Sequence, residues 1–296
     1  MVSGSRRSIG QLLREGERSF SFEFFPPKSA EGEQQLWQAI RELEPYRPTF
    51  VSVTYGAGGT TRDTTVQITG RIARETSMLP MAHLTVVGHT REELEAILAA
   101  YAEARVSHVL ALRGDPPAGP GTPWEATPGG FRYASELVAL VAGRGGFTVG
   151  VAAHPEGHRE AASLEDDVRV LLAKQEAGAE FAVTDMFFRL EDYLGLVERS
   201  AAAGVEIPIL PGIMPITNLR QVTRMSELSG RDVPPDVVAR VARHEDDPAA
   251  LRAEGIAMAA ELCDALLAAD APGLHFYTLN RSRATREIFA ALSITA

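Results

Sequence analysis

The sequence lacks several features that would define its chemistry at once. It has a single cysteine, Cys263, so no intrachain disulfide and no zinc site built from several cysteines can form. Acidic residues outnumber basic ones, 39 to 29, and the net charge of −10 argues against binding of nucleic acid or of an anionic membrane through overall charge. A local basic site for a phosphate group remains compatible with this balance.

Long apolar segments are lacking as well. No stretch approaches the ~20 apolar residues of a membrane-spanning helix. The N-terminal segment MVSGSRRSIGQLLREGERS has an arginine pair but no apolar core of the kind found in signal peptides. We therefore expect a cytoplasmic protein with no membrane partner. Hydrophobic residues make up 45% of the 296 residues and charged residues 23%, which is enough for a sizeable core.

Short β-rich segments recur along the whole chain. They lie at residues 19–25, 50–56, 81–87, 108–114, 148–155, 181–188, 207–215 and 273–280. The sequence between them has helical periodicity, as at 33–46, 90–104 and 163–178. Strict alternation of strands and helices predicts parallel strands with crossover helices, and the number of units matches an α/β fold of the (β/α)8 TIM barrel type. We expect one domain over 1–296, with 230–250 as an additional segment before a long helix.

The competing architecture is a doubly wound open sheet. No G-x-G-x-x-G motif follows the first predicted strand, and GAGG at 56–59 follows the second strand without that spacing. A flexible turn is the simpler interpretation of GAGG. The barrel is therefore favoured.

The first predicted strand, FSFEFFPP, has a carboxylate among phenylalanines. Phe20, Phe22 and Phe24 alternate with Ser19, Ser21 and Glu23. In a barrel one face of each strand meets the outer helices and the other faces the interior. The phenylalanines suit the helix-facing side, so Glu23 is predicted to point inward near the C-terminal mouth, where barrel active sites lie. A structural ion pair with an arginine is the alternative role.

Other polar residues end the remaining predicted strands. They are Thr54, Tyr55, His83, Arg113, Gly114, Asp115, His154, His158, Asp185, Tyr277, Asn280 and Arg281. Because the C-terminal ends of parallel strands meet at one rim, these side chains are expected to gather there. A concentration of Glu, His, Asp and Arg at one rim is what an active site requires.

Three chemistries could use such a set. A divalent metal is disfavoured because no H-x-H or H-E-x-x-H motif occurs, and we expect none. Glycoside hydrolysis by Glu23 and Asp115 would need exposed aromatics, but Trp37 and Trp124 lie outside the strand ends. The third possibility is an organic cofactor, with an acid for proton transfer and basic residues for phosphates.

At this point a family can be named. The blocks FSFEFFPPK, FVSVTYGAGG, AHLT, LALRGDPP, VAAHPEGH, PGIMPITN and HFYTLNR together resemble the bacterial type of methylenetetrahydrofolate reductase, from about residue 8 to about residue 293. The resemblance implies a flavoprotein in which NADH or NADPH reduces FAD, and the reduced flavin passes a hydride to 5,10-methylenetetrahydrofolate. The product is 5-methyltetrahydrofolate. It also implies a homo-oligomer.

The resemblance also implies roles for individual residues. Glu23 matches the general acid that protonates N10 of the folate, and Asp115 matches an aspartate beside the flavin and the pterin. A carboxyl that donates a proton near neutral pH needs a raised pKa, which burial at the barrel mouth would provide. The residues at FAD-contacting positions are Thr54, Tyr55, Ala57, His83, Arg113, Gly114, Asp115, Ala134, His154, His158, Ala161, Asp167 and Lys174. Those at substrate-contacting positions are Glu23, Asp115, Asp185, Gln221, Tyr277 and Arg281.

One departure from the family pattern bears on the reaction. Asp185 stands where the family's well-known form has a glutamine, and an ionised aspartate only accepts hydrogen bonds whereas an amide also donates. Val170 and Ala173 replace polar contacts to the cofactor in some members. Two alternatives to the flavoenzyme therefore stay open: a reductase of the same fold that transfers hydride directly from nicotinamide to folate, and a non-catalytic paralogue that binds folate or flavin.

Overall fold

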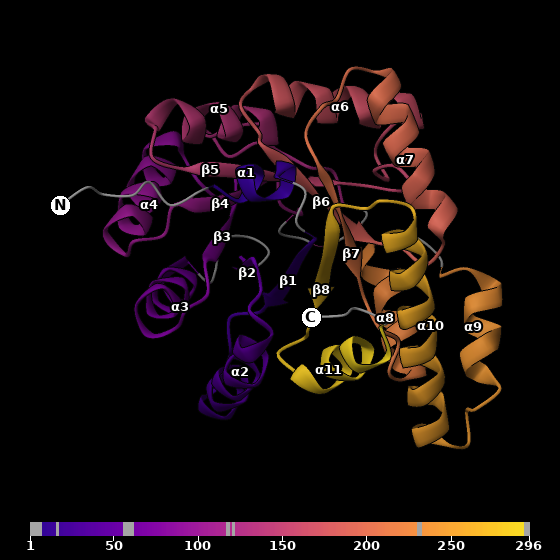
Figure 1. Ribbon diagram of the computed structural model, residues 1–296. Helices are drawn as coiled ribbons and strands as arrows, with labels where there is room; N and C mark the ends of the chain where they lie inside the picture. The colour runs from indigo at the N-terminus through magenta and orange to yellow at the C-terminus, as the bar shows by residue number, and fades with distance from the viewer. Residues whose placement is uncertain are drawn as a thin grey trace.

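The computed structural model describes residues 8–15, 18–55, 62–116, 119, 122–229 and 233–292. Its strands pair in chain order, β1 with β2 through to β8, and β8 pairs with β1, so the sheet closes into a barrel (Figure 1). Every neighbouring pair is parallel. The predicted (β/α)8 barrel is confirmed.

The strands coincide with the predicted β-rich segments. They are β1 Ser19–Phe24, β2 Phe50–Val53, β3 Pro80–Thr85, β4 His108–Leu112, β5 Thr148–Ala153, β6 Phe181–Met186, β7 Ile209–Ile213 and β8 Gly273–Tyr277. The predicted segments extend beyond the last paired residue because the chain leaves the ladder at the mouth to form the loops that carry polar side chains.

The helices lie around the barrel except for α1, which packs against residues of the barrel interior (Figure 1). They are α1 Ile9–Arg14, α2 Ala30–Leu43, the 3-10 turn η1 Glu44–Tyr46, α3 Arg62–Glu75, α4 Arg91–Glu103, α5 Ala134–Arg144, α6 Leu164–Glu176, α7 Leu190–Ala202, α8 Leu219–Ser229, α9 Pro235–Ala242, α10 Pro248–Ala268 and α11 Ser282–Ala291. The additional segment predicted at 230–250 contains α9, which packs against α8 and α10. In the part of the chain that is described, no helix is both long and apolar enough to cross a membrane.

The alternation in β1 places its side chains as the sequence predicts. Phe22 and Phe24 are fully buried in the layer between sheet and helices. Phe20 packs edge-on against Phe289 of α11, with 5.2 Å between ring centroids. Glu23 has the opposite orientation and is bonded to residues of other strands across the barrel interior.

The interior of the barrel has an apolar lower half. Phe50 and Phe181, the first residues of their strands, lie there with Leu210, and Ile9 and Leu13 of α1 pack against this cluster. The polar side chains are thereby left to the upper half, at the C-terminal mouth.

Helix α6 brings two charged side chains to the same side. Ser163 caps its N-terminus by accepting a hydrogen bond from the Asp166 backbone N–H. Gly178, just beyond its C-terminus, has a φ of +114°, a backbone conformation that favours glycine. Asp167 in the first turn and Lys174 in the last turn are both buried, because seven residues are about two helical turns.

Candidate active site

Glu23 lies at the centre of a polar cluster in the barrel mouth. Its side chain is 7% exposed. Ser52 Oγ donates a hydrogen bond to Glu23 Oε2 over 3.3 Å, and His275 Nε2 lies 3.3 Å from the same oxygen in hydrogen-bond geometry. His83 Nε2 is also 3.3 Å away but is not aligned to hydrogen-bond. Four strands, β1, β2, β3 and β8, therefore contribute to one cluster.

His275 is a member of this cluster that the sequence analysis missed. Its Nδ1 lies 2.8 Å from Ser21 Oγ, and its ring stacks on Phe50 with 5.7 Å between centroids. These contacts fix the ring so that Nε2 points at Glu23. The signal was present in the alternation of the predicted strand 273–280, where His275 and Tyr277 share the inward face.

The charge state of Glu23 differs from the expectation. Burial on its own would raise the pKa of Glu23, but the positive charge of His83 and the hydrogen bond from His275 outweigh it and lower the pKa to about 2. The expected raised pKa is therefore wrong for this arrangement of Glu23, His83 and His275. At neutral pH Glu23 is a carboxylate that accepts hydrogen bonds.

A second group of charges lies between β5 and α6. Lys174 donates from Nζ to the Ala152 carbonyl at 2.8 Å, and Asp167 Oδ2 lies 3.5 Å from His154 Nδ1. Burial, opposed by the charge of Asp167 and reinforced by that of Arg113, lowers the pKa of Lys174 to about 8. A buried ammonium with a lowered pKa is one that an anionic ligand would stabilise.

His158 completes this group. Its ring meets the His154 ring edge-on at 4.9 Å. Burial, together with the charges of His154 and Arg113, lowers the pKa of His158 to about 4, so its imidazole is neutral near pH 7. Ala161, one turn further along the same loop, donates its backbone N–H to the His158 carbonyl at 2.9 Å.

The loop after β4 starts from a tightly packed turn. Gly114 has a φ of +83°, and a Cβ there would lie 2.4 Å from Val87 Cγ1, so only glycine fits. Trp124 donates from Nε1 to the Gly114 carbonyl at 3.1 Å, and its ring stacks under the Arg113 guanidinium at 5.1 Å. Arg113 also pairs with Glu160 at 2.7 Å. Trp124, which the sequence places away from the strand ends, thus returns to the mouth.

Four other predicted site residues lie outside the Glu23 cluster and the Lys174 group. Asp115 and Asp185 are exposed at the ends of β4 and β6, and Arg281 is exposed at the N-terminus of α11. Gln221 uses its amide within its own loop: Oε1 accepts from the Thr217 N–H at 2.9 Å, and Nε2 donates to the Pro215 carbonyl at 3.0 Å.

Three further cofactor contacts predicted from the resemblance lie on or beside the mouth. Thr54 follows β2 and bonds through its N–H to the Phe24 carbonyl. The Tyr55 side chain is instead buried in the outer core, where its hydroxyl lies 3.0 Å from His89 Nε2. Ala134 is buried at the start of α5. Ala57 lies outside the described residues. No comparison tests the residue assignments, and they stay predictions.

Two buried polar atoms on β3 have no hydrogen-bond partner within the described structure. They are His83 Nε2 and Thr85 Oγ1. Both side chains are on the face opposite Leu84, which belongs to the outer core, so they face the barrel interior. His83 Nε2 lies 3.3 Å from Glu23 Oε2, so Thr85 Oγ1 is the one of the two that is left open to a polar group of a ligand.

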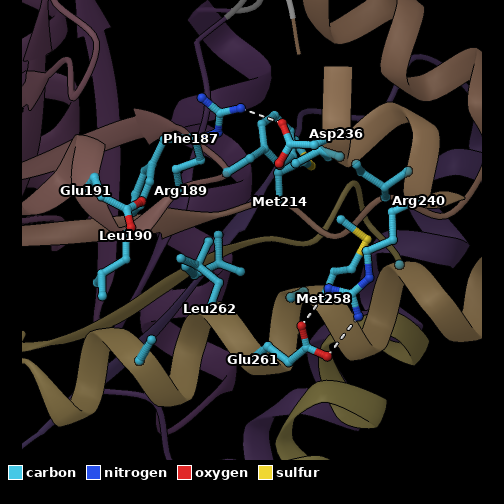
Figure 2. A pocket seen from close by; sticks show the side chains of 17 residues that line it. Phe187, Arg189, Leu190, Glu191, Met214, Asp236, Arg240, Met258, Glu261 and Leu262 are labelled. Atoms are coloured by element: carbon cyan, nitrogen blue, oxygen red, sulfur yellow. Dashed lines mark hydrogen bonds and ion pairs between the residues drawn. The ribbon is translucent and has the colours of Figure 1, made fainter. Parts of the chain in front are cut away.

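A separate hollow of about 320 Å³ lies outside the barrel between α7, α9 and α10 (Figure 2). Four of its five charged side chains form two ion pairs, Arg189 with Asp236 and Arg240 with Glu261 at 2.7 Å, and the fifth is Glu191. None of the predicted site residues lines it. The barrel mouth, with the Glu23 cluster, the unpartnered Thr85 Oγ1 and several perturbed pKa values, is the better candidate site. Across the described ranges, no group of three or more His, Cys, Asp or Glu side chains is arranged to hold a metal ion.

Comparison with known proteins identifies the family. The family model for methylenetetrahydrofolate reductase matches residues 8–293. The chain belongs to the methylenetetrahydrofolate reductase family. It is 36% identical over 294 residues to the 5,10-methylenetetrahydrofolate reductase of Escherichia coli strain K12, covering 99% of this chain and 97% of that protein. The enzyme of Pectobacterium carotovorum subsp. carotovorum is also 36% identical, with coverage of 99% and 96%.

Plant members of this reductase family are longer. The Arabidopsis thaliana methylenetetrahydrofolate reductase (NADH) 1 is 34% identical over 297 residues, which are 97% of this chain and 50% of that protein. Among solved structures, a Clostridium thermocellum protein that binds two copies of 5-methyl-5,6,7,8-tetrahydrofolic acid superimposes with a TM-score of 0.62 at 12% identity, covering 96% of this chain and 98% of that one. At that identity the likeness concerns the fold alone.

Proposed function

We propose that this protein reduces 5,10-methylenetetrahydrofolate to 5-methyltetrahydrofolate, with NADH as the reductant and FAD as the bound cofactor. Family membership and full-length similarity to bacterial reductases support the reaction. The names of the Arabidopsis and maize relatives specify NADH, which is why we place NADH ahead of NADPH. The observation that carries the proposal is the Glu23 cluster beside the unpartnered Thr85 Oγ1 at the barrel mouth.

The residues at the mouth fit a flavin dinucleotide. Lys174 and Arg113 supply positive charge for a pyrophosphate, and the pKa of Lys174, lowered to about 8, leaves free energy to be gained when an anion binds. Thr85 Oγ1 offers a polar atom to the isoalloxazine ring. When bound, FAD would supply reversible hydride transfer between the nicotinamide and the folate.

Glu23 and its histidines are proposed as the proton source for N10 of the folate. Because the pKa of Glu23 is lowered to about 2, we propose that the proton reaches its Oε2 from a neighbouring imidazole. His275 Nε2 and His83 Nε2, each 3.3 Å away, are placed for that transfer. Asp115, exposed at the end of β4, is proposed to stabilise the cationic form of the substrate that results.

An anaerobic titration tests the proposal. The purified protein, incubated with FAD if it is colourless, should show flavin bands that bleach with NADH and return when methylenetetrahydrofolate is added. NADH oxidation by the folate with no bound flavin would replace this proposal with direct hydride transfer. Folate binding detected by calorimetry without any NADH oxidation would replace it with a binding role.

A further inference from the structure

Strand β6 carries an extra residue where it reaches the mouth. From the pair Val183–Leu210 to the pair Met186–Gly212, β6 advances three residues while β7 advances two. Bulges of this kind redirect a side chain, and they are common beside active sites. Asp185 lies in the bulge. Its side chain is exposed at the mouth and lies near enough to Tyr277, on β8, for its charge to act on the phenol.

At the bulge, hydrogen bonds made by side chains replace the backbone hydrogen bonds of the regular β-ladder. Thr184 Oγ1 accepts a hydrogen bond from the Gly212 N–H at 2.8 Å. The Tyr277 hydroxyl donates to the Thr184 carbonyl at 2.7 Å. Asp185 Oδ1 accepts from the Met186 N–H at 2.8 Å. The Tyr277 bond joins two strands that are not neighbours, since β7 lies between β6 and β8.

Gly212 makes this bond possible. A Cβ at residue 212 would lie 2.5 Å from the Thr184 carbonyl oxygen and 2.8 Å from Cε2 of Tyr277. The tyrosine therefore crosses β7 over a residue with no side chain and reaches the bulge beyond it. Any other residue at 212 would displace either the ring or the β6 backbone.

Tyr277 also touches the Glu23 cluster. Its ring meets the His275 ring edge-on at 5.5 Å, and Tyr277 is the register partner of Glu23 in the β1–β8 pair. Burial and the nearby charges of Glu23 and Asp185 raise the pKa of Tyr277, so the phenol keeps its proton and acts as a donor. One side chain thus links Glu23's histidine to the backbone that carries Asp185.

We propose that Tyr277 is a positioning residue: through its bond to the Thr184 carbonyl it fixes the β6 bulge that directs Asp185 toward the substrate. The resemblance assigns Tyr277 a substrate contact of its own, but its hydroxyl is already used by Thr184. The part of this inference that concerns substrate rests on the proposed folate reduction. The part that concerns the bulge does not.

The bulge is tested without any activity measurement. Hydrogen–deuterium exchange should speed up in peptides covering 181–188 when Tyr277→Phe removes the hydroxyl, and should not change in peptides covering β5. Tyr101→Phe is the matched control, because the Tyr101 hydroxyl also donates to a strand carbonyl, that of His83, at 3.1 Å, and β3 pairs with neither β6 nor β7. Unchanged exchange at 181–188 in Tyr277→Phe overturns the proposal.

The substrate part is tested by a double-mutant comparison. In the wild-type background, Tyr277→Phe should raise the KM for methylenetetrahydrofolate on the order of tenfold, from a carbonyl left unpaired and a displaced carboxylate. In an Asp185→Ala background it should add less than about twofold, because there is no side chain left to position. Equal effects in both backgrounds would mean direct contact and overturn the positioning role. A wild-type protein that does not turn over folate would instead refute the proposed function, and the exchange result would still decide the bulge.

Discussion

Replacing Glu23 by glutamine removes a charge and keeps the shape of the side chain. In the folded protein the pKa of Glu23 is lowered from 4.5 to about 2. One pKa unit corresponds to about 1.4 kcal/mol, so the ionised carboxylate contributes about 3 kcal/mol to the free energy of unfolding. Glu23→Gln should lose about this amount near neutral pH, since the amide retains hydrogen bonds but not the attraction to His83.

The pH dependence follows from the sign of the shift. A folded-state pKa below the unfolded value stabilises the protein fully above pH 4.5, and this contribution is lost as the pH falls through about 2. The difference in unfolding free energy between wild type and Glu23→Gln should therefore decline from about 3 kcal/mol at about pH 7 to about 2 kcal/mol at about pH 3.5. Subtracting the two proteins cancels the titration of every shared carboxylate.

Urea unfolding followed by circular dichroism gives these differences directly. Glu261→Gln is the control: Glu261 is also paired, with Arg240, but its side chain is 60% exposed, so its loss should cost less than about 1 kcal/mol. The reasoning would be refuted if Glu23→Gln were as stable as wild type at neutral pH and wild type became the more stable protein as the pH fell. Glu23 would then be a protonated acid with a raised pKa.

Three further substitutions probe the rest of the mouth. Lys174→Met should stabilise the protein without FAD by about 1–3 kcal/mol at about pH 7. This gain should disappear between about pH 8 and 10.5, because wild-type Lys174 loses its proton there. A fluorescence titration should show weaker FAD binding by the variant. Gly212→Ala should lower the thermal midpoint and raise the KM for the folate together, because its Cβ collides with Tyr277 and the Thr184 carbonyl. Asp185→Gln should lower the KM for the folate in steady-state assays, since an amide can donate as well as accept.

The sequence was sufficient for the architecture and for the direction of most strand side chains. Alternation alone predicted that Phe22 and Phe24 face the helices and that Glu23 faces inward, as the structure has them. The β6 bulge was not predictable, because the extra residue becomes visible only when β6 is aligned with β7. The hydrogen bond from Trp124 to the Gly114 carbonyl was not predictable either, because residues in loops follow no periodic pattern.

The charge on Glu23 shows why a site is harder to predict than a fold. A carboxyl in an apolar strand suggested desolvation and a raised pKa, which is the correct inference from β1 alone. The outcome depends on His83 and His275, which lie on β3 and β8 and reach Glu23 only through the register of the closed barrel. The burial that would raise the pKa of Glu23 can be predicted from β1, but the histidines that lower it lie far away in the sequence. The proton proposed for N10 is therefore shared by Glu23, His83 and His275 together. Changing either histidine should alter the pH profile of the folate step even though Glu23 itself is unchanged.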